Sequence, residues 1–310
     1  MLKPGKRHRP CLAYAASMEI GIALPTMCRG YDRSSTVDWC RLADEGPFSS
    51  VSCGERVTFH NPEMWTTLAA AAALTERLRI VVNLSVLPAH PPALVAKQVA
   101  TLDVLSEGRV TLGVGIGGRE HDYRALDAPF ERRHARLDAD VAALRELWSG
   151  TPAFDGADPL GPPCVQAGGP PILAGALGPK AMARAARWAD GLIGFSVAGV
   201  PKEMQATADA GRRAWDEAGR ATPRLVSGCF YVLGVPDAAN TLRDFTAEYI
   251  AILGAGFADA MARSMTTFDS DAMNRALDGA EEAGIDEFIL VPGSPDVAVL
   301  EATIDLIAKR

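Results

Sequence analysis

Residues 78–118, LRIVVNLSVLPAHPPALVAKQVATLDVLSEGRVTLGVGIGG, decide the fold class of this chain. Two runs in this stretch, residues 78–86 and 109–114, are rich in β-branched and apolar residues and predict buried strands. Between them the apolar residues recur with the period of a helix, at Val95, Val99, Leu102 and Leu105. A strand, a helix and a second strand form a βαβ unit, whose two strands lie parallel in one sheet.

The same alternation extends toward both ends of the chain. Eight strands are predicted, at residues 19–24, 48–53, 78–86, 109–114, 171–175, 191–195, 224–233 and 287–291. Residues 151–170, rich in Gly, Pro and Asp, predict an irregular loop after the fourth unit, and residues 254–269 predict a second irregular zone that covers the site. We therefore expect an α/β fold, a single (β/α)8 TIM barrel over residues 18–310, with irregular loops after strands 4 and 7.

The first residues, 1–17, are predicted to form a flexible N-terminal extension. Basic residues precede a short apolar run from Cys11 to Ala16, which imitates a secretory signal but is too short to be one. No stretch of the chain approaches the roughly 20 apolar residues that a membrane helix needs. We therefore expect a cytoplasmic protein with no membrane partner.

Composition narrows the classes of partner. The chain of 310 residues has a formal charge of −7 and a pI near 5.3, which argue against nucleic acid or an anionic membrane surface as the main partner. Its six cysteines lack the spacing of a zinc site or of a disulfide framework. We expect reduced thiols, no metal and a small-molecule substrate.

In a parallel barrel the segments that follow the strands converge on one face, where ligands bind. The fourth predicted strand runs into a glycine-dense turn that contains Gly117 and Gly118. Glycine lets backbone amides approach a ring or a phosphate closely. A tight turn that simply needs small residues explains the same run equally well.

A second candidate segment follows the fifth predicted strand. It comprises Gly175, Ala176, Leu177 and Gly178, and precedes Lys180 and a predicted helix over residues 181–188. Free amides and a lysine at a helix start favour a phosphate, although an ordinary helix start has the same sequence. After the second strand, Glu55 and Arg56 form a charged pair that is either functional or a solvated ion pair of a loop.

Several separated motifs resemble the luciferase-like superfamily of flavin- and deazaflavin-dependent oxidoreductases. They are MEIGIALP at residues 18–25, the block at residues 78–148, PPILAGALGPKAMARAARWADGLIGF at residues 170–195 and AEEAGIDEFILVP at residues 280–292. The resemblance spans the chain from Met18 to its end and keeps the order of the motifs. It implies a coenzyme ring that rests on a bulge of the third strand, with a non-prolyl cis peptide expected at Ser85–Val86.

The resemblance also implies phosphate contacts from Gly117, Gly118 and the stretch from Gly175 to Gly178. Two departures from the family pattern limit what it implies. Arg56 stands where many relatives have a histidine, and Gly118 stands where some deazaflavin-dependent sugar-phosphate dehydrogenases have an acid, with Glu120 displaced by two positions. Sugar-phosphate specificity is therefore not expected.

The favoured reaction is hydride transfer between coenzyme F420 and a small organic substrate, with Glu55 and His121 as candidates for moving the proton. Arg56 is a permanent cation that can pair with a carbonyl or an anionic ring oxygen. Two alternatives stay open, an FMN-dependent monooxygenase that uses molecular oxygen and a non-catalytic flavin-binding barrel. The resemblance is also consistent with a homodimer.

Overall fold

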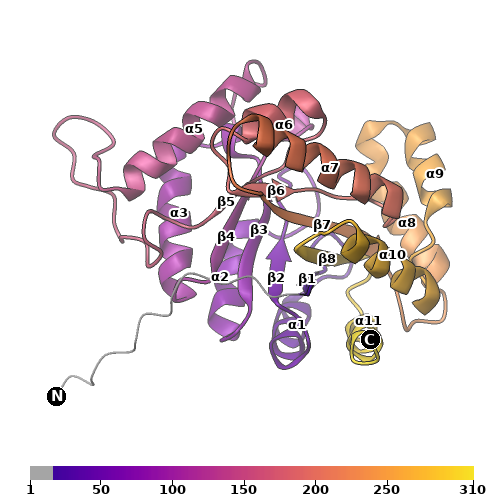
Figure 1. Ribbon diagram of the computed structural model, residues 1–310. Coiled ribbons are helices and arrows are strands. Elements are labelled where there is room, and N and C mark those ends of the chain that lie inside the picture. The colour runs from indigo at the N-terminus through magenta and orange to yellow at the C-terminus, as the bar shows by residue number, and fades with distance from the viewer. Residues whose placement is uncertain (1–16) are drawn as a thin grey trace.

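Eight parallel strands close into a barrel, in which each strand pairs with its two neighbours along the chain (Figure 1). The computed structural model describes residues 17–310. Apart from Ser17, the predicted extension at residues 1–17 lies outside the described residues. The strands are β1 (Glu19–Ala23), β2 (Ser50–Cys53), β3 (Arg79–Ser85), β4 (Val110–Val114), β5 (Ile172–Ala174), β6 (Gly191–Ile193), β7 (Arg224–Tyr231) and β8 (Glu287–Pro292). The predicted barrel and all eight predicted strands are confirmed.

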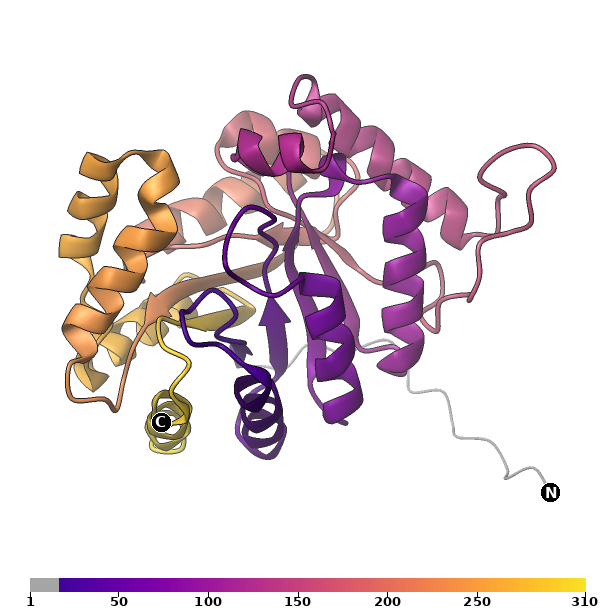
Figure 2. The same ribbon diagram turned by 180° about the vertical axis from the view of Figure 1, so that it is seen from behind.

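Helices surround the barrel, as the two opposite views show (Figures 1 and 2). In α3, Val95, Val99 and Leu102 of the predicted stripe are buried against the strands, as a 3.6-residue period requires, whereas Leu105, the last residue of the helix, is 49% exposed. The helical elements are α1 (Arg33–Glu45), α2 (Met64–Leu74), η1 (Leu87–Ala89), α3 (Pro92–Leu105), α4 (Glu120–Ala125), α5 (Arg133–Trp148), α6 (Pro179–Ala185), α7 (Pro201–Glu217), α8 (Ala238–Ile250), η2 (Ala251–Leu253), α9 (Ala255–Ser264), α10 (Ser270–Glu282) and α11 (Val297–Ile307).

The predicted irregular loop at residues 151–170 is confirmed, because it contains neither helix nor strand and projects beside α5 (Figures 1 and 2). The irregular zone predicted at residues 254–269 is wrong over most of its length, since α9 occupies it. Ala258 and Ala262, four residues apart, bury one side of α9, and α9 packs on α8. Gly254 and Gly256 disfavour a helix, so the sequence predicted an irregular segment where this alanine-rich helix lies.

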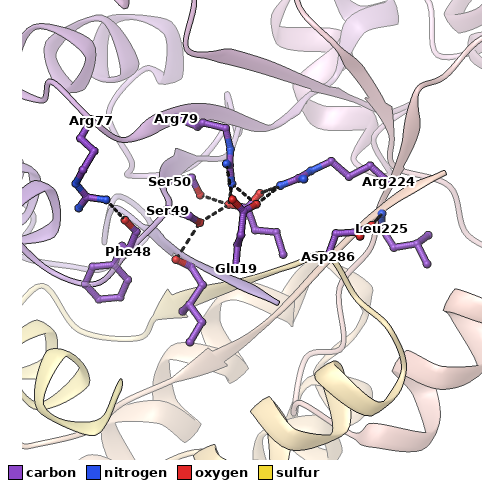
Figure 3. A network of polar contacts seen from close by, with 11 residues as sticks. Glu19, Phe48, Ser49, Ser50, Arg77, Arg79, Arg224, Leu225 and Asp286 are labelled. Carbon is purple, nitrogen blue, oxygen red and sulfur yellow. Dashed lines mark hydrogen bonds and ion pairs between the residues drawn. The ribbon is translucent and has the colours of Figure 1, made fainter. Parts of the chain in front are cut away.

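A charged network closes the end of the barrel where the strands begin (Figure 3). Glu287, at the start of β8, is 1% exposed and lies 3.0 Å from Arg79 and 2.7 Å from Arg224. Glu19 bridges the same two arginines. Burial raises the pKa of Glu287, but the charges of Arg79 and Arg224 outweigh burial and hold that pKa below its usual value. Paired charges therefore close this end of the barrel.

The described residues contain no membrane-spanning helix, no disulfide and no metal-binding cluster. None of the helices in the described part of the chain is long and apolar enough to cross a membrane. The five cysteines among residues 17–310 are all free, and no cluster of three or more His, Cys, Asp or Glu side chains there could hold a metal ion.

Replacing Glu287 should destabilise the fold. Glu287→Gln leaves two buried arginines with half of their counter-charge, so we expect the free energy of unfolding to fall by about 3–5 kcal/mol. Urea denaturation measures this change. Asp278→Asn is the matched control, because Asp278 forms an exposed ion pair with Arg310 and should cost less than about 1 kcal/mol. Equal effects of the two substitutions would contradict a structural role for the network.

Candidate active site

The end of β3 departs from the regular ladder with β4. The pairing register shifts between Val82 and Ser85, and the Asn83–Leu84 peptide bond is cis. The expected bulge with a non-prolyl cis peptide is therefore present, but its predicted position at Ser85–Val86 is wrong. Ser85 already pairs with Val114 again, so the irregular residues lie before it.

The side chain of Leu84 lies at the mouth of the barrel. It packs on an apolar cluster contributed by strands around the barrel, which includes Val81 and Leu173, and it stays half-buried. Glycines in the neighbouring strand ends make room for it. A Cβ at Gly175 would lie 2.4 Å from Leu84 Cδ2, and one at Gly115 would lie 3.0 Å from Cδ1. The glycines that follow β4 and β5 thus shape an apolar surface as well as two turns.

Glu55 ties the segment after β2 to the end of β3. One carboxylate oxygen accepts hydrogen bonds from the Val86 amide at 2.6 Å and from the Ser85 hydroxyl at 3.3 Å. The other oxygen lies 2.6 Å from Nε2 of His90. The Glu55 side chain is only 7% exposed, and that of His90 is 14% exposed. Glu55 is thus a buried acceptor of three donors, and its geometry suits positioning of the bulge.

His90, the partner of Glu55, has a raised pKa. Burial lowers the pKa of His90, but the hydrogen bond and the charge of Glu55 outweigh burial and raise that pKa above its usual value. His90 follows β3 by five residues and was not predicted as a site residue. A titratable side chain in the segment after a barrel strand was the signal that could have found it.

The glycine turn after β4 is held in place from both sides. Tyr123, fully buried in α4, donates a hydrogen bond to the Ile116 carbonyl at 2.6 Å. Gly117 has φ +60°, and a Cβ there would lie 2.7 Å from Val86. Gly118 faces open space, with nothing within 4 Å of a Cβ. Gly117 is therefore required by the packing, whereas Gly118 leaves an open approach to the backbone.

Several amides at this end of the barrel have no protein acceptor. Among the described residues, no hydrogen bond is donated by the backbone amides of Gly117, Gly118, Ala176, Leu177 and Gly178. Both turns follow the carboxyl ends of neighbouring strands, β4 and β5. Free amides in two adjacent turns suit an anionic or polar ligand atom.

The remaining predicted residues lie on the surface around this mouth. Leu177 is 85% exposed, and Lys180 is exposed in the first turn of α6, which begins and ends earlier than the predicted helix at residues 181–188. His121 is exposed on α4 and makes no hydrogen bond with a described residue. The structure thus brings Glu55, Ser85 and Val86 together, and it brings neither His121 nor Lys180 into contact with them.

Arg56 lies in a second group of residues at the same end of the barrel. Its guanidinium carbon lies 3.6 Å from the ring centre of Phe59 and 5.3 Å from that of Tyr249. Arg119 approaches the same Tyr249 ring at 5.2 Å and donates a hydrogen bond to the Tyr249 carbonyl. Sequence reasoning missed Arg119, although it directly follows the glycine turn, and it missed Tyr249, which comes from a distant helix with no motif.

Comparisons with known proteins agree with this architecture. Residues 18–307 match the family described as luciferase-like monooxygenase. An uncharacterized protein of Mycobacterium tuberculosis is 36% identical over 166 residues, a match that spans 52% of this chain and only 57% of the relative. An F420-dependent hydroxymycolic acid dehydrogenase of the same species is 33% identical over 142 residues, 43% of this chain and 39% of the relative.

A solved structure shows the same fold. The oxygenating constituent of 3,6-diketocamphane monooxygenase from Pseudomonas putida, in complex with FMN, superposes with a TM-score of 0.69 over 94% of this chain and 97% of that chain. Its sequence identity is 17%, so the likeness concerns the fold alone.

Removing the imidazole of His90 should make stability less dependent on pH. A pKa that is raised on folding stabilises the protein fully below the unfolded value of about 6.5, and the gain is lost as pH rises through the folded pKa. We expect His90→Gln to lower the free energy of unfolding by about 1.5–3 kcal/mol at pH 5. The deficit should shrink toward pH 9. Urea denaturation across this range measures it, with exposed His134→Gln as the control, and a deficit that grows with pH would contradict the pairing.

The two adjacent glycines should respond differently to alanine. Gly117→Ala adds a Cβ at positive φ and against Val86, so we expect a loss of about 1–3 kcal/mol in the free energy of unfolding. Gly118→Ala meets open space and should stay within about 0.5 kcal/mol of the parent. Thermal or chemical denaturation of both variants measures this. A tolerated alanine at position 117 would show that the turn is not held as described.

Proposed function

Because the chain belongs to the luciferase-like monooxygenase family, we propose that it is an oxidoreductase that holds a flavin or deazaflavin coenzyme at the carboxyl ends of its barrel strands. Within this class we propose hydride transfer between coenzyme F420 and a small organic substrate. The F420-dependent relative from Mycobacterium tuberculosis supports the deazaflavin. The similarity covers less than half of each chain, so the reaction itself is our inference.

One combination of features carries the proposal. Leu84 offers a half-buried apolar surface at the mouth of the barrel, and the turns after β4 and β5 offer amides without a protein acceptor beside it. A planar ring with a phosphate-bearing tail needs these two surfaces next to each other. The residues present therefore fit a flavin-type coenzyme.

Each group of side chains has a task in this proposal. Leu84 supports the ring, while Gly117, Gly118, Ala176, Leu177 and Gly178 donate amides to the phosphate, with Lys180 close by. The amide of Gly175 is already donated to the Val114 carbonyl at 2.8 Å, so Gly175 serves by leaving room for Leu84. Glu55 holds Ser85 and Val86 in place through its hydrogen bonds. When bound, the coenzyme supplies the redox chemistry, as a carrier of hydride in the deazaflavin or as an oxygen-reactive ring in FMN.

The proton has two candidate carriers. Glu55 is hydrogen-bonded to three donors, so it acts first as an anchor for the bulge. His121 is exposed on α4 and free to approach a substrate, so we retain it as the candidate that exchanges a proton with solvent. The substrate approaches through the open mouth of the barrel and meets the face of the ring that points away from the barrel interior.

The second candidate is an FMN-dependent monooxygenase. The FMN-bound monooxygenase of Pseudomonas putida shares the fold, and the family takes its description from that reaction. The two candidates differ in what happens to oxygen, because the deazaflavin ring reacts poorly with it.

Titration of the purified chain with each coenzyme tests the proposed function. We expect F420 to bind at micromolar concentration or tighter, and the reduced complex to pass hydride to a carbonyl substrate without consuming oxygen. Tight FMN binding with substrate-dependent oxygen uptake would overturn the deazaflavin assignment. Binding without turnover of any substrate would favour a non-catalytic flavin-binding barrel, and no binding of either coenzyme would overturn the proposal.

A variant of Glu55 links this function to the site. Glu55→Gln weakens the hold on Val86 and His90, so we expect coenzyme affinity, followed by ring fluorescence, to fall about tenfold. Glu301→Gln, an exposed carboxylate on α11, is the control and should bind normally. An unchanged affinity of Glu55→Gln would place the ring away from the bulge.

A further inference from the structure

We propose that Arg56 and Arg119 form a binding site for an anionic group, a carboxylate or a phosphate, that the organic substrate carries. The inference rests on the proposed function, because it names the class of substrate that would meet the coenzyme. The substrates would be organic acids or phosphate esters, held by their charged end at the mouth of the barrel.

The two arginines come from different parts of the barrel and meet at one ring. Arg56 follows the end of β2, Arg119 follows the glycine turn after β4, and both guanidinium carbons lie within 5.3 Å of the centre of the Tyr249 ring. Tyr249 belongs to α8, which follows β7. The segments that carry Arg56, Arg119 and Tyr249 all follow the carboxyl ends of strands. These strand ends form the face of the barrel where the candidate coenzyme site lies.

The donors of this pair are not satisfied by the protein. Nε and Nη1 of Arg56 and Nε of Arg119 are buried and have no hydrogen-bond partner among the described residues. A guanidinium group offers five N–H donors in a planar fork that matches a carboxylate or a phosphate. Buried donors without acceptors are costly, and three of them on two guanidinium groups that meet at one ring support an acceptor that arrives from outside the chain.

The acids nearest to Arg56 are already engaged elsewhere. Asp122 accepts hydrogen bonds from the amide and the hydroxyl of Thr58, at 2.7 and 2.5 Å. Glu248 pairs with Arg29 and lies 3.6 Å from His60. Neither carboxylate contacts Arg56 by a hydrogen bond or ion pair. Burial and the charge of Arg119 lower the pKa of Arg56 to about 10, which agrees with an incompletely neutralised pair.

At the opposite end of the barrel, buried arginines are neutralised by carboxylates of the chain itself. There, Arg79 and Arg224 share the carboxylates of Glu19 and Glu287. Arg56 and Arg119 are brought together with no such carboxylate between them. The missing negative charge at the mouth is what an anionic substrate supplies.

An aromatic wall extends from this pair. Tyr249 contacts Phe59 and Phe230 edge to face, with ring centres 6.3 and 5.2 Å away. Phe195, two residues after β6, contacts Phe230 with ring centres 4.8 Å apart and is 38% exposed. An apolar body beside an anionic end therefore fits this region better than a uniformly polar substrate.

Calorimetric titration of the full chain without coenzyme, using inorganic phosphate and then glutarate, tests the anion site. We expect the parent to bind both probes, and Arg56→Gln and Arg119→Gln each to weaken binding about tenfold or more. Arg56→Lys should weaken it less, since it keeps the charge but loses the fork. Arg243→Gln is the matched control, because Arg243 also faces a ring with a buried unpartnered Nε, but that ring is Phe268 and not the Tyr249 ring that Arg56 and Arg119 share.

Circular dichroism confirms folding of each variant before titration. No binding by the parent, or equal binding by the parent and by both glutamine variants, would overturn the site. Coenzyme titrations of the same variants separate the two sources of the anion. Unchanged coenzyme affinity supports the substrate, whereas a parallel loss would assign the site to the acidic tail of the coenzyme. Phosphate binding through both arginines in a chain that binds neither coenzyme would leave the anion site standing while the proposed function fails.

Discussion

The candidate site depends on the hydrogen bonds that Glu55 makes to the end of β3. The strand leaves its ladder with β4 between Val82 and Ser85, so its backbone there lacks regular sheet partners. Glu55 anchors the chain directly after this irregular stretch, because its carboxylate accepts the Val86 amide and is itself oriented by His90. This arrangement fixes Leu84 above the apolar interior of the barrel. The glycines after β4 and β5 then follow as a packing requirement, since a side chain there would collide with Leu84 or Val86.

The two ends of the barrel use charge in opposite ways. At the start of the strands, buried arginines and glutamates pair with one another, which closes that end and contributes to stability. At the carboxyl ends, amides in two turns and the guanidinium groups of Arg56 and Arg119 keep donors without protein acceptors. Donors without a protein acceptor are available to a ligand, and here they lie at the carboxyl ends of the strands. This difference between the two ends supports both the proposed coenzyme site and the proposed anion site.

The strands and the barrel could be predicted from the sequence because buried parallel strands are nearly continuous apolar runs, and their order needs no long-range information. The site was harder to predict. Glu55, Ser85 and Val86 came from strand-end positions and family resemblance, and the structure joins them. The cis peptide was placed two residues too late, because a register shift between two strands leaves no mark in one sequence. Arg119 and Tyr249 were missed because their contact joins residues 130 positions apart. Two glycines similarly hid α9, whose alanines pack on α8.

The most direct test of the central claim is a crystal structure of the chain with its coenzyme bound. The account predicts a ring that lies against Leu84 and a phosphate within hydrogen-bond distance of the amides in the turns after β4 and β5. The Glu55 contacts to Val86 and His90 should stay intact in that complex. A ring bound elsewhere, or a bulge that rearranges so that Glu55 releases Val86, would contradict it.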